Sequence, residues 1–189
     1  LSNMFALFMF AGPIERVMGS KRFLNYYLIC GLGAAALQMA VTNIGTSAKV
    51  NAVEAVGVQV GEVKQMVVDS HISLDQANAT LNGIVAQHPG SGDAVEALFW
   101  DYNGVMIGAS GAIFGVLLAF GMFFPNVELF LLFLPIPIKA KYFVALYGLW
   151  ELFSGVHVKA GDNVAHFAHL GGLIVGFFII LYWRKKRVV

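Results

Sequence analysis

The chain has 189 residues, of which 58% are hydrophobic and only 12% are charged, and its mean hydropathy is +0.73. This composition excludes an ordinary soluble domain and indicates a membrane protein. The formal net charge of +1 gives no sign of a nucleic-acid partner, and we expect none. The single cysteine, Cys30, cannot form an internal disulfide and is expected to be a buried thiol.

The first segments predict one partial and one complete membrane helix. Residues 1–11 are apolar, and Gly12 and Pro13 are expected to close the helix. A helix that crosses a bilayer needs about 20 residues. Because the chain begins inside an apolar run, we expect a longer protein with at least one more helix upstream. Residues 23–44 are long enough to span, with Tyr26 and Tyr27 as interfacial anchors.

Residues 45–105 are more polar and predict a helical hairpin outside the membrane. Valines spaced by three and four from Val53 to Val67 indicate one face of an amphipathic helix. Ser73 is placed to cap a second helix with the same spacing of apolar residues. An aromatic cluster then predicts the return of the chain to the membrane interface. Its members are Phe99, Trp100 and Tyr102.

Two later apolar segments carry polar side chains near their starts. Residues 108–124 begin with Gly108-Ala109-Ser110-Gly111, and residues 164–183 carry His166 and His169. A hydroxyl and an imidazole in two membrane helices suggest a nucleophile and its base. An interhelical hydrogen bond would explain an isolated membrane histidine, but polar side chains inside a membrane are functional candidates by default.

Two further segments separate these helices. Residues 127–138 are apolar but are broken by Pro135 and Pro137, so they are expected to lie along the interface. Residues 139–155 form another helix. The positions of lysine and arginine then predict the orientation of the bundle.

If the segments alternate, most basic residues fall on one side, which we expect to be cytoplasmic and to include the C-terminus. On that side lie Arg16, Lys21, Arg22, Lys139, Lys141 and residues 184–187. The serine and histidine helices then run parallel, and both begin on the outer side.

The two polar side chains are expected at similar depths. From Ser110 to Phe124 the helix is roughly 22 Å long against about 30 Å of hydrocarbon, which leaves Ser110 about 8 Å below the outer surface. His169 follows Asp162 by seven residues, roughly 10 Å down its own helix. The serine and the histidine can therefore meet if neither helix is strongly tilted.

Glycines predict close packing of these two helices. Gly172 and Gly176 share a helix face with His169, because they follow it by three and seven residues. Gly111 and Gly115 likewise share a face just inside the serine. Facing glycines permit close approach of two backbones, which would bring hydroxyl and imidazole within hydrogen-bond reach.

Other intramembrane protease chemistries fit the sequence poorly. It contains no H-E-x-x-H zinc motif, and His166 and His169 with Asp162 could bind a metal only loosely. No pair of membrane aspartates is present for aspartyl chemistry. We therefore expect no metal and no cofactor.

Over nearly its whole length, apart from residues 45–105, the chain resembles the rhomboid intramembrane serine proteases. The matching residues are Asn3-Met4, Gly12, Glu15, Arg16, Gly19-Ser20, Gly108–Gly111, residues 124–126, 135–143 and 165–172, and Gly176. The resemblance implies an all-α polytopic membrane helix bundle formed by residues 1–44 and 106–189. The insertion of residues 45–105 would lie outside it as a helical hairpin.

The resemblance implies Ser110 as nucleophile and His169 as base, a dyad without a carboxylate. The family holds the oxyanion with the backbone N–H of the serine, an asparagine, matched by Asn3, and a histidine four residues earlier, which would precede Leu1. Gly108 opens the serine motif. The remaining auxiliary positions are His166 and Phe114.

Each auxiliary position has a plainer explanation. His166, one turn nearer the outside, is expected to hydrogen-bond or pack rather than act as base. Phe114 matches an aromatic residue that packs on the catalytic imidazole, although ordinary core packing explains it equally well. The helix of residues 139–155 is a proposed lateral gate in the family, so Trp150, Glu151 and Phe153 could line the access of substrate. Glu151 could equally extend toward the outer interface.

The resulting hypothesis is an intramembrane serine endopeptidase in the bacterial cytoplasmic membrane. Its partners would be the lipid bilayer and single-span substrates with small or helix-destabilising residues near their outer end, an inference from the resemblance. The alternative is a non-catalytic rhomboid-like protein that binds or escorts membrane partners. A small transporter would require inverted repeats, and no convincing internal repeat is present.

Overall fold

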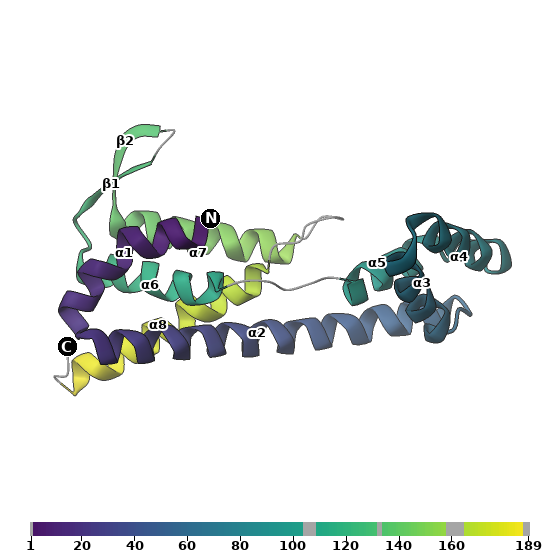
Figure 1. The fold of residues 1–189 in the computed structure, drawn as a ribbon, viewed down its shortest axis with the longest axis horizontal. Coiled ribbons are helices and arrows are strands. Elements are labelled where there is room, and N and C mark those ends of the chain that lie inside the picture. The colour runs from purple at the N-terminus through teal and green to yellow at the C-terminus, as the bar shows by residue number, and fades with distance from the viewer. Residues whose placement is uncertain (1, 104–108, 132–133, 158–164, 187–189) are drawn as a thin grey trace. The chain divides into compact units, whose positions relative to one another are not determined.

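The structure is a computed structural model that describes residues 2–103, 109–131, 134–157 and 165–186 (Figure 1). The helices in these ranges are α1 (Ser2–Met18), α2 (Ser20–Ala55), α3 (Val60–Ile72), α4 (Leu74–Gln87), α5 (Gly92–Asn103), α6 (Ser110–Phe123), α7 (Ala140–Val156) and α8 (His166–Lys185). Two short strands, β1 (Glu128–Leu131) and β2 (Leu134–Lys139), lie between α6 and α7. The predominance of helix confirms the predicted all-α fold.

The chain divides into two compact units. The first contains residues 1–39, 107–158 and 164–189, and the second contains residues 40–106 and 159–163. The division falls within α2, which contributes residues to both units. The second unit covers nearly the same residues as the insertion expected from the sequence.

The first helix continues past its predicted end. Gly12 and Pro13 lie inside α1, which ends only at Met18. Gly19 follows with a φ of 80° and donates its N–H to the carbonyl oxygen of Glu15 at 2.7 Å. Glycine adopts this left-handed conformation without the steric cost that a side chain imposes. The prediction that the helix closes at Gly12-Pro13 is therefore wrong.

The second helix is longer than the predicted span and continues into the insertion. It ends at Ala55, and Gly57, with a φ of 81°, reverses the chain. The valine face expected from Val53 to Val67 on one helix is wrong, because this turn divides it between α2 and α3. The two ends of the face still share the core of the second unit, where Val53 and Val63 are fully buried.

The second unit contains α3, α4 and α5 with the end of α2, so the predicted hairpin has one helix too few. As predicted, Ser73 caps α4, and its hydroxyl accepts the N–H of Asp75 at 3.2 Å. Phe99 is buried in the core, with Tyr102 packed against it. The apolar face of α5 packs against its own unit, while Trp100 is exposed, and the assignment of this cluster to the membrane interface stays a prediction.

A polar cluster joins α2 to α5 inside the second unit. One carboxylate oxygen of Asp101 accepts a hydrogen bond from the hydroxyl of Thr46, and the other accepts one from the ammonium group of Lys49. The Asp101 side chain is 12% exposed, and that of Lys49 is 38% exposed. The carboxylate is therefore paired with a cation that remains in contact with solvent.

The first unit is arranged around α6, which has no exposed residue along its length. At 14 residues it is roughly 21 Å long, shorter than the roughly 30 Å of a hydrocarbon core. Since its flanks are covered by neighbouring helices, it need not satisfy the length that lipid demands of an exposed span.

Tyr26 shows how α2 packs on this central helix. Its side chain is fully buried, and its hydroxyl donates to the carbonyl oxygen of Gly115 at 2.7 Å. A Cβ at Gly176 would collide with the same hydroxyl. The prediction of Tyr26 as an interfacial anchor is wrong, because its ring is buried in the bundle, where the absence of a side chain at Gly176 makes room for it. Cys30 is buried beside it, as expected.

Strands β1 and β2 pair in antiparallel fashion, which the sequence analysis did not predict. Their register pairs Glu128 with Lys139 and Leu129 with Ile138. Both strands of a two-stranded sheet are edges, where a proline without an N–H is tolerated, so Pro135 and Pro137 fit within β2.

Two described helices, α2 and α8, are long and apolar enough to cross a membrane, and α6 is a shorter apolar helix. The outward faces of α2, α7 and α8 are also apolar. They carry Leu24, Leu28, Leu32, Leu146, Leu149, Phe177, Phe178 and Leu181, all exposed in the isolated chain. Contiguous exposed apolar surface of this kind indicates contact with lipid.

Candidate active site

Helices α6 and α8 run parallel, as the sequence predicts. At their starts, a Cβ added at Gly111 would lie 2.9 Å from the carbonyl oxygen of Ala168. At their ends, the guanidinium of Arg184 donates to the carbonyl oxygen of Met122 at 2.8 Å. The N-terminal ends of the two helices therefore lie together, and so do their C-terminal ends. Ser110 and His166 accordingly begin their helices on the same side of the unit.

Glycines set the separation of these helices. A Cβ at Gly172 would overlap the carbonyl oxygen of Gly111, and one at Gly115 would lie 3.3 Å from the carbonyl oxygen of Gly172. The backbones are thus in direct contact, as in small-xxx-small packing. This contact lies one residue after Ser110 on α6 and one turn after His169 on α8.

The ring of His169 is fixed on one face by an aromatic side chain. Phe114 stacks on it with a centroid separation of 4.1 Å and an interplanar angle of 8°. Tyr147 of α7 lies against Phe114 at 4.8 Å. Since Ser110 precedes Phe114 by one helical turn, the two share a face of α6, and the serine lies on the side of the helix that meets His169.

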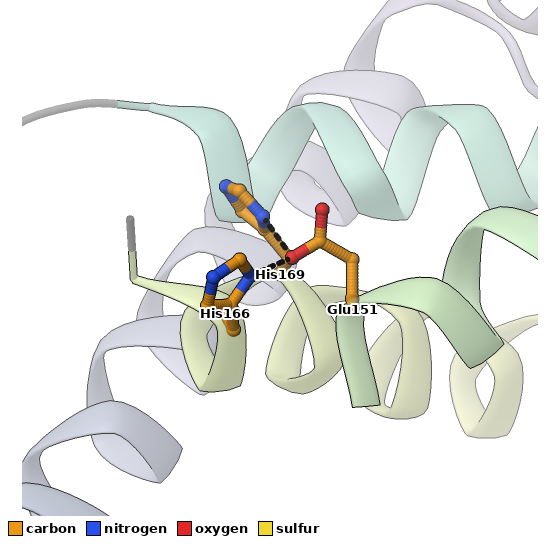
Figure 2. Close-up of side chains that lie close together, drawn as sticks. All are labelled: Glu151, His166 and His169. Atoms are coloured by element: carbon orange, nitrogen blue, oxygen red, sulfur yellow. Dashed lines mark hydrogen bonds and ion pairs between the residues drawn. The ribbon is translucent and has the colours of Figure 1, made fainter. Parts of the chain in front are cut away.

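A carboxylate meets both histidines. Oε2 of Glu151 lies 2.6 Å from Nδ1 of His166 and 2.9 Å from Nδ1 of His169 (Figure 2). The Glu151 side chain is 4% exposed, and those of the two histidines are 8% and 11% exposed. Among the described residues of the first unit, these three are the buried carboxylate and imidazole side chains. An ionised group buried this way requires such partners.

The contact of Glu151 with His166 is the better aligned of the two. It meets the geometry of a hydrogen bond, whereas Nδ1 of His169 approaches the same oxygen without doing so. The 2.9 Å separation still places the two groups within reach of each other, because a small rotation of the ring or the carboxylate would align them.

Glycines of α7 allow this helix to pack closely on α8, which places the carboxylate of Glu151 beside the two histidines. A Cβ at Gly155, one turn after Glu151, would lie 3.1 Å from Cβ of His166. One at Gly148, one turn before, would lie 3.2 Å from Cδ1 of Leu173. Gly148, Glu151 and Gly155 therefore form the face of α7 that packs on α8. Glu151 points into the bundle, so the reading that it extends toward the outer interface is wrong.

The same three side chains are the group that could hold a metal ion, with ligand atoms within 4.8 Å of one another. Two ligands of a tetrahedral zinc ion, each about 2.0–2.1 Å from it, lie roughly 3.3 Å apart. The 2.6 Å between Glu151 and His166 is shorter and has the length of a hydrogen bond. The observed geometry therefore favours a hydrogen-bonded network.

The other residues proposed for the site have different positions. Asn3 is half-buried in the first turn of α1, and no hydrogen bond within the described ranges joins it to Ser110 or His169. Gly108 lies outside the described residues. Trp150 and Phe153 are 62% and 57% exposed, so they lie on the outward side of α7, unlike the buried Glu151.

Sequence reasoning missed two partners of the histidine helix. It considered Glu151 only at the gate or the interface, and it did not consider Gln38 of α2. The side-chain oxygen of Gln38 accepts the N–H of Ala168 at 3.0 Å and so satisfies a backbone donor in the first turn of α8. Both residues are polar within apolar segments, which is the signal that could have found them.

A family model of the Rhomboid domain matches residues 1–186. Searches of the curated proteins and of the solved structures found no significant match. The matched range covers the two units and includes Ser110, Glu151, His166 and His169. Rhomboid proteins are integral membrane proteins, and the family includes both intramembrane serine proteases and inactive members. The parallel serine and histidine helices and this match identify the chain as a member of the rhomboid family.

Proposed function

We propose that this chain is an intramembrane serine endopeptidase with Ser110 as nucleophile and His169 as general base. The observation that carries the proposal is the fixed ring of His169. Phe114 covers one face, Glu151 meets Nδ1, and the serine helix begins beside it. Nucleophilic catalysis requires a base held in one orientation within reach of a hydroxyl, and the start of the serine helix supports that placement.

The first chemical step moves one proton. With Nδ1 directed at Glu151, Nε2 of His169 is the nitrogen left to accept the hydroxyl proton of Ser110 as its Oγ attacks the peptide carbonyl carbon. The imidazolium then returns this proton to the leaving amine, and water hydrolyses the acyl-enzyme with the same base. Backbone N–H groups in the first turn of α6 lack helical acceptors and can stabilise the oxyanion. We assign Asn3 to the same role.

The substrates would be single-span membrane proteins. The apolar surface of the first unit is suited to a hydrocarbon environment, and a peptide bond within a substrate helix must unwind before a serine can reach it. Substrates with small or helix-destabilising residues near their outer end satisfy this condition. We assign Trp150 and Phe153, exposed on α7, to the surface that such a helix passes.

The proposed location is the bacterial cytoplasmic membrane, with the C-terminus inside. Arg184 and Lys185 lie in the last turn of α8, at the end opposite His166 and His169. By the positive-inside rule this end is cytoplasmic, so the site faces the outer half of the membrane. A reporter fused to the C-terminus, active only in the cytoplasm, tests this orientation.

The experiment that tests the function compares three alanine variants in proteoliposomes with a single-span substrate. We expect Ser110→Ala and His169→Ala each to abolish cleavage, and His166→Ala to retain measurable turnover. A fluorophosphonate probe should label the wild type and not Ser110→Ala. Equal losses at the two histidines would reassign the base, and a wild type that neither cleaves nor labels would favour the alternative, a non-catalytic protein that binds membrane partners.

A further inference from the structure

We infer that Glu151 is a positioning residue for His169, which makes the site a relay of serine, histidine and glutamate in place of a dyad. This inference rests on the proposed function of Ser110 and His169. It starts from Oε2 of Glu151, which lies 2.9 Å from Nδ1 of His169 in a buried contact between α7 and α8.

The carboxylate determines which nitrogen of His169 can act as base. A carboxylate only accepts hydrogen bonds, so it stabilises the imidazole that carries its proton on Nδ1. Nε2 is then unprotonated and free to receive the proton of Ser110. Phe114 fixes the orientation of the ring plane, and Glu151 favours the tautomer that carries its proton on Nδ1.

The carboxylate also stabilises the charge that forms during attack. When Nε2 takes the proton of Ser110, His169 becomes an imidazolium whose Nδ1–H still points at Glu151. No proton passes to the carboxylate; the other changes are the new bond from Oγ of Ser110 to the carbonyl carbon and the conversion of the carbonyl oxygen to an oxyanion. An opposite charge 2.9 Å away, with side chains only 4% and 11% exposed, acts with little screening by water.

His166 has a separate part in this arrangement. Its Nδ1 binds the same oxygen at 2.6 Å, so it holds the carboxylate in place from the turn before His169. Removing His166 should weaken the relay, whereas removing the charge of Glu151 should break it. This gives the order of effects Glu151→Gln greater than His166→Ala.

The kinetic test is Glu151→Gln, which keeps the shape of the side chain and removes its charge. We expect kcat to fall roughly 100-fold, the lower range of a general-base contribution, with KM unchanged. Fluorophosphonate labelling of Ser110 should slow by a similar factor, since it reports the nucleophile without a transmembrane substrate. The matched control is Glu128→Gln, an exposed glutamate of β1, which should behave as the wild type.

A Glu151→Gln protein that melts like the wild type and labels at the wild-type rate would overturn this inference while leaving Ser110 and His169 in their proposed roles. Absence of Ser110-dependent labelling in the wild type would instead count against the proposed function. The two failures are therefore distinguishable.

A second measurement needs no change at Glu151 and applies if Glu151→Gln does not fold. In the wild type with 15N-labelled histidine in bilayers, solid-state NMR reports which ring nitrogen carries the proton. We expect His169 to be protonated on Nδ1, with its signals identified by their loss in His169→Gln. Protonation on Nε2 with a bare Nδ1 would overturn the inference.

Discussion

Each unit of this molecule holds one carboxylate between two side chains from another helix, and the difference between the two arrangements is instructive. Asp101 in the second unit is held by Thr46 and Lys49, of which the lysine is 38% exposed. Glu151 in the first unit is held by two buried imidazoles. Lysine keeps its charge near neutral pH, whereas histidine can gain or lose a proton there. The first arrangement can only join helices, and the second can also take part in proton transfer.

The change with the largest expected effect removes the geometry of the buried arrangement. Gly172→Val places a branched side chain where the carbonyl oxygen of Gly111 already lies, so α6 and α8 must separate. We expect a loss of more than about 3 kcal/mol, as for severe overpacking, together with all cleavage activity. Thermal unfolding in detergent and proteolysis of a reporter substrate measure the two effects.

Gly45→Val is the matched control, because no atom lies within 4 Å of a Cβ at Gly45. Valine has a higher helix propensity than glycine, so this change should lower the stability by no more than a few tenths of a kcal/mol. A Gly172→Val protein as stable as this control would contradict the direct contact of α6 with α8.

The next largest effect comes from the ring that covers His169. Phe114→Leu keeps an apolar side chain but removes the stacked contact at 4.1 Å. Aromatic pairs contribute about 0.5–1.5 kcal/mol beyond their buried area, so kcat should fall roughly 2- to 10-fold. The fall should appear in the labelling rate of Ser110 as well as in substrate cleavage. A loss confined to KM would mean that Phe114 serves substrate binding.

Asp101→Asn examines the carboxylate of the second unit. It removes the charge partner of Lys49 and should lower the free energy of unfolding by about 0.5–1 kcal/mol, because that lysine is 38% exposed and water screens the pair. Labelling of Ser110 at a temperature where the protein is folded should match the wild type. A rate that falls as far as in Glu151→Gln would remove the distinction between the two carboxylates.

The smallest effect concerns Asp69, an exposed carboxylate of α3. Hydrogen bonds from Thr80 first and Gln65 second lower the pKa of Asp69 below its ordinary value of 3.8. A carboxyl whose pKa is lower in the folded state contributes stability above its unfolded pKa, and this contribution is lost as the pH falls through the folded pKa. Thr80→Val should raise the pKa of Asp69 toward 3.8 in an NMR titration. An unchanged pKa would show that Thr80 does not stabilise the ionised form.

Much of the site could be predicted because its signals are local. The bounds of α6, α7 and α8 follow from apolar runs ended by proline, glycine or charge. The positions of Ser110, His166 and His169 follow from helix periodicity. Glycines spaced by three and four predicted the closest contact in the bundle, that of Gly111 with Gly172.

What the sequence could not predict depends on contacts between distant segments. Glu151 has exposed neighbours on both sides in the chain, and only the packing of Gly155 on His166 decides that it points inward. Tyr26 is buried because Gly176 on α8 leaves room for its ring. The pairing of β1 with β2 could not be predicted, because a segment that lies along the membrane interface has the same apolar composition.

The covered, 14-residue helix α6 has a consequence for the choice of lipid. A change in acyl-chain length alters the difference between bilayer thickness and the hydrophobic length of the lipid-facing helices. This mismatch costs fractions of a kcal/mol per Å and acts on helices with outward apolar faces, here α2, α7 and α8. The depth of Ser110 follows from the tilt of those neighbours, since α6 has no face of its own to match to the membrane. Thicker and thinner vesicles should therefore move the scissile position along a substrate, while the labelling chemistry of the serine stays the same.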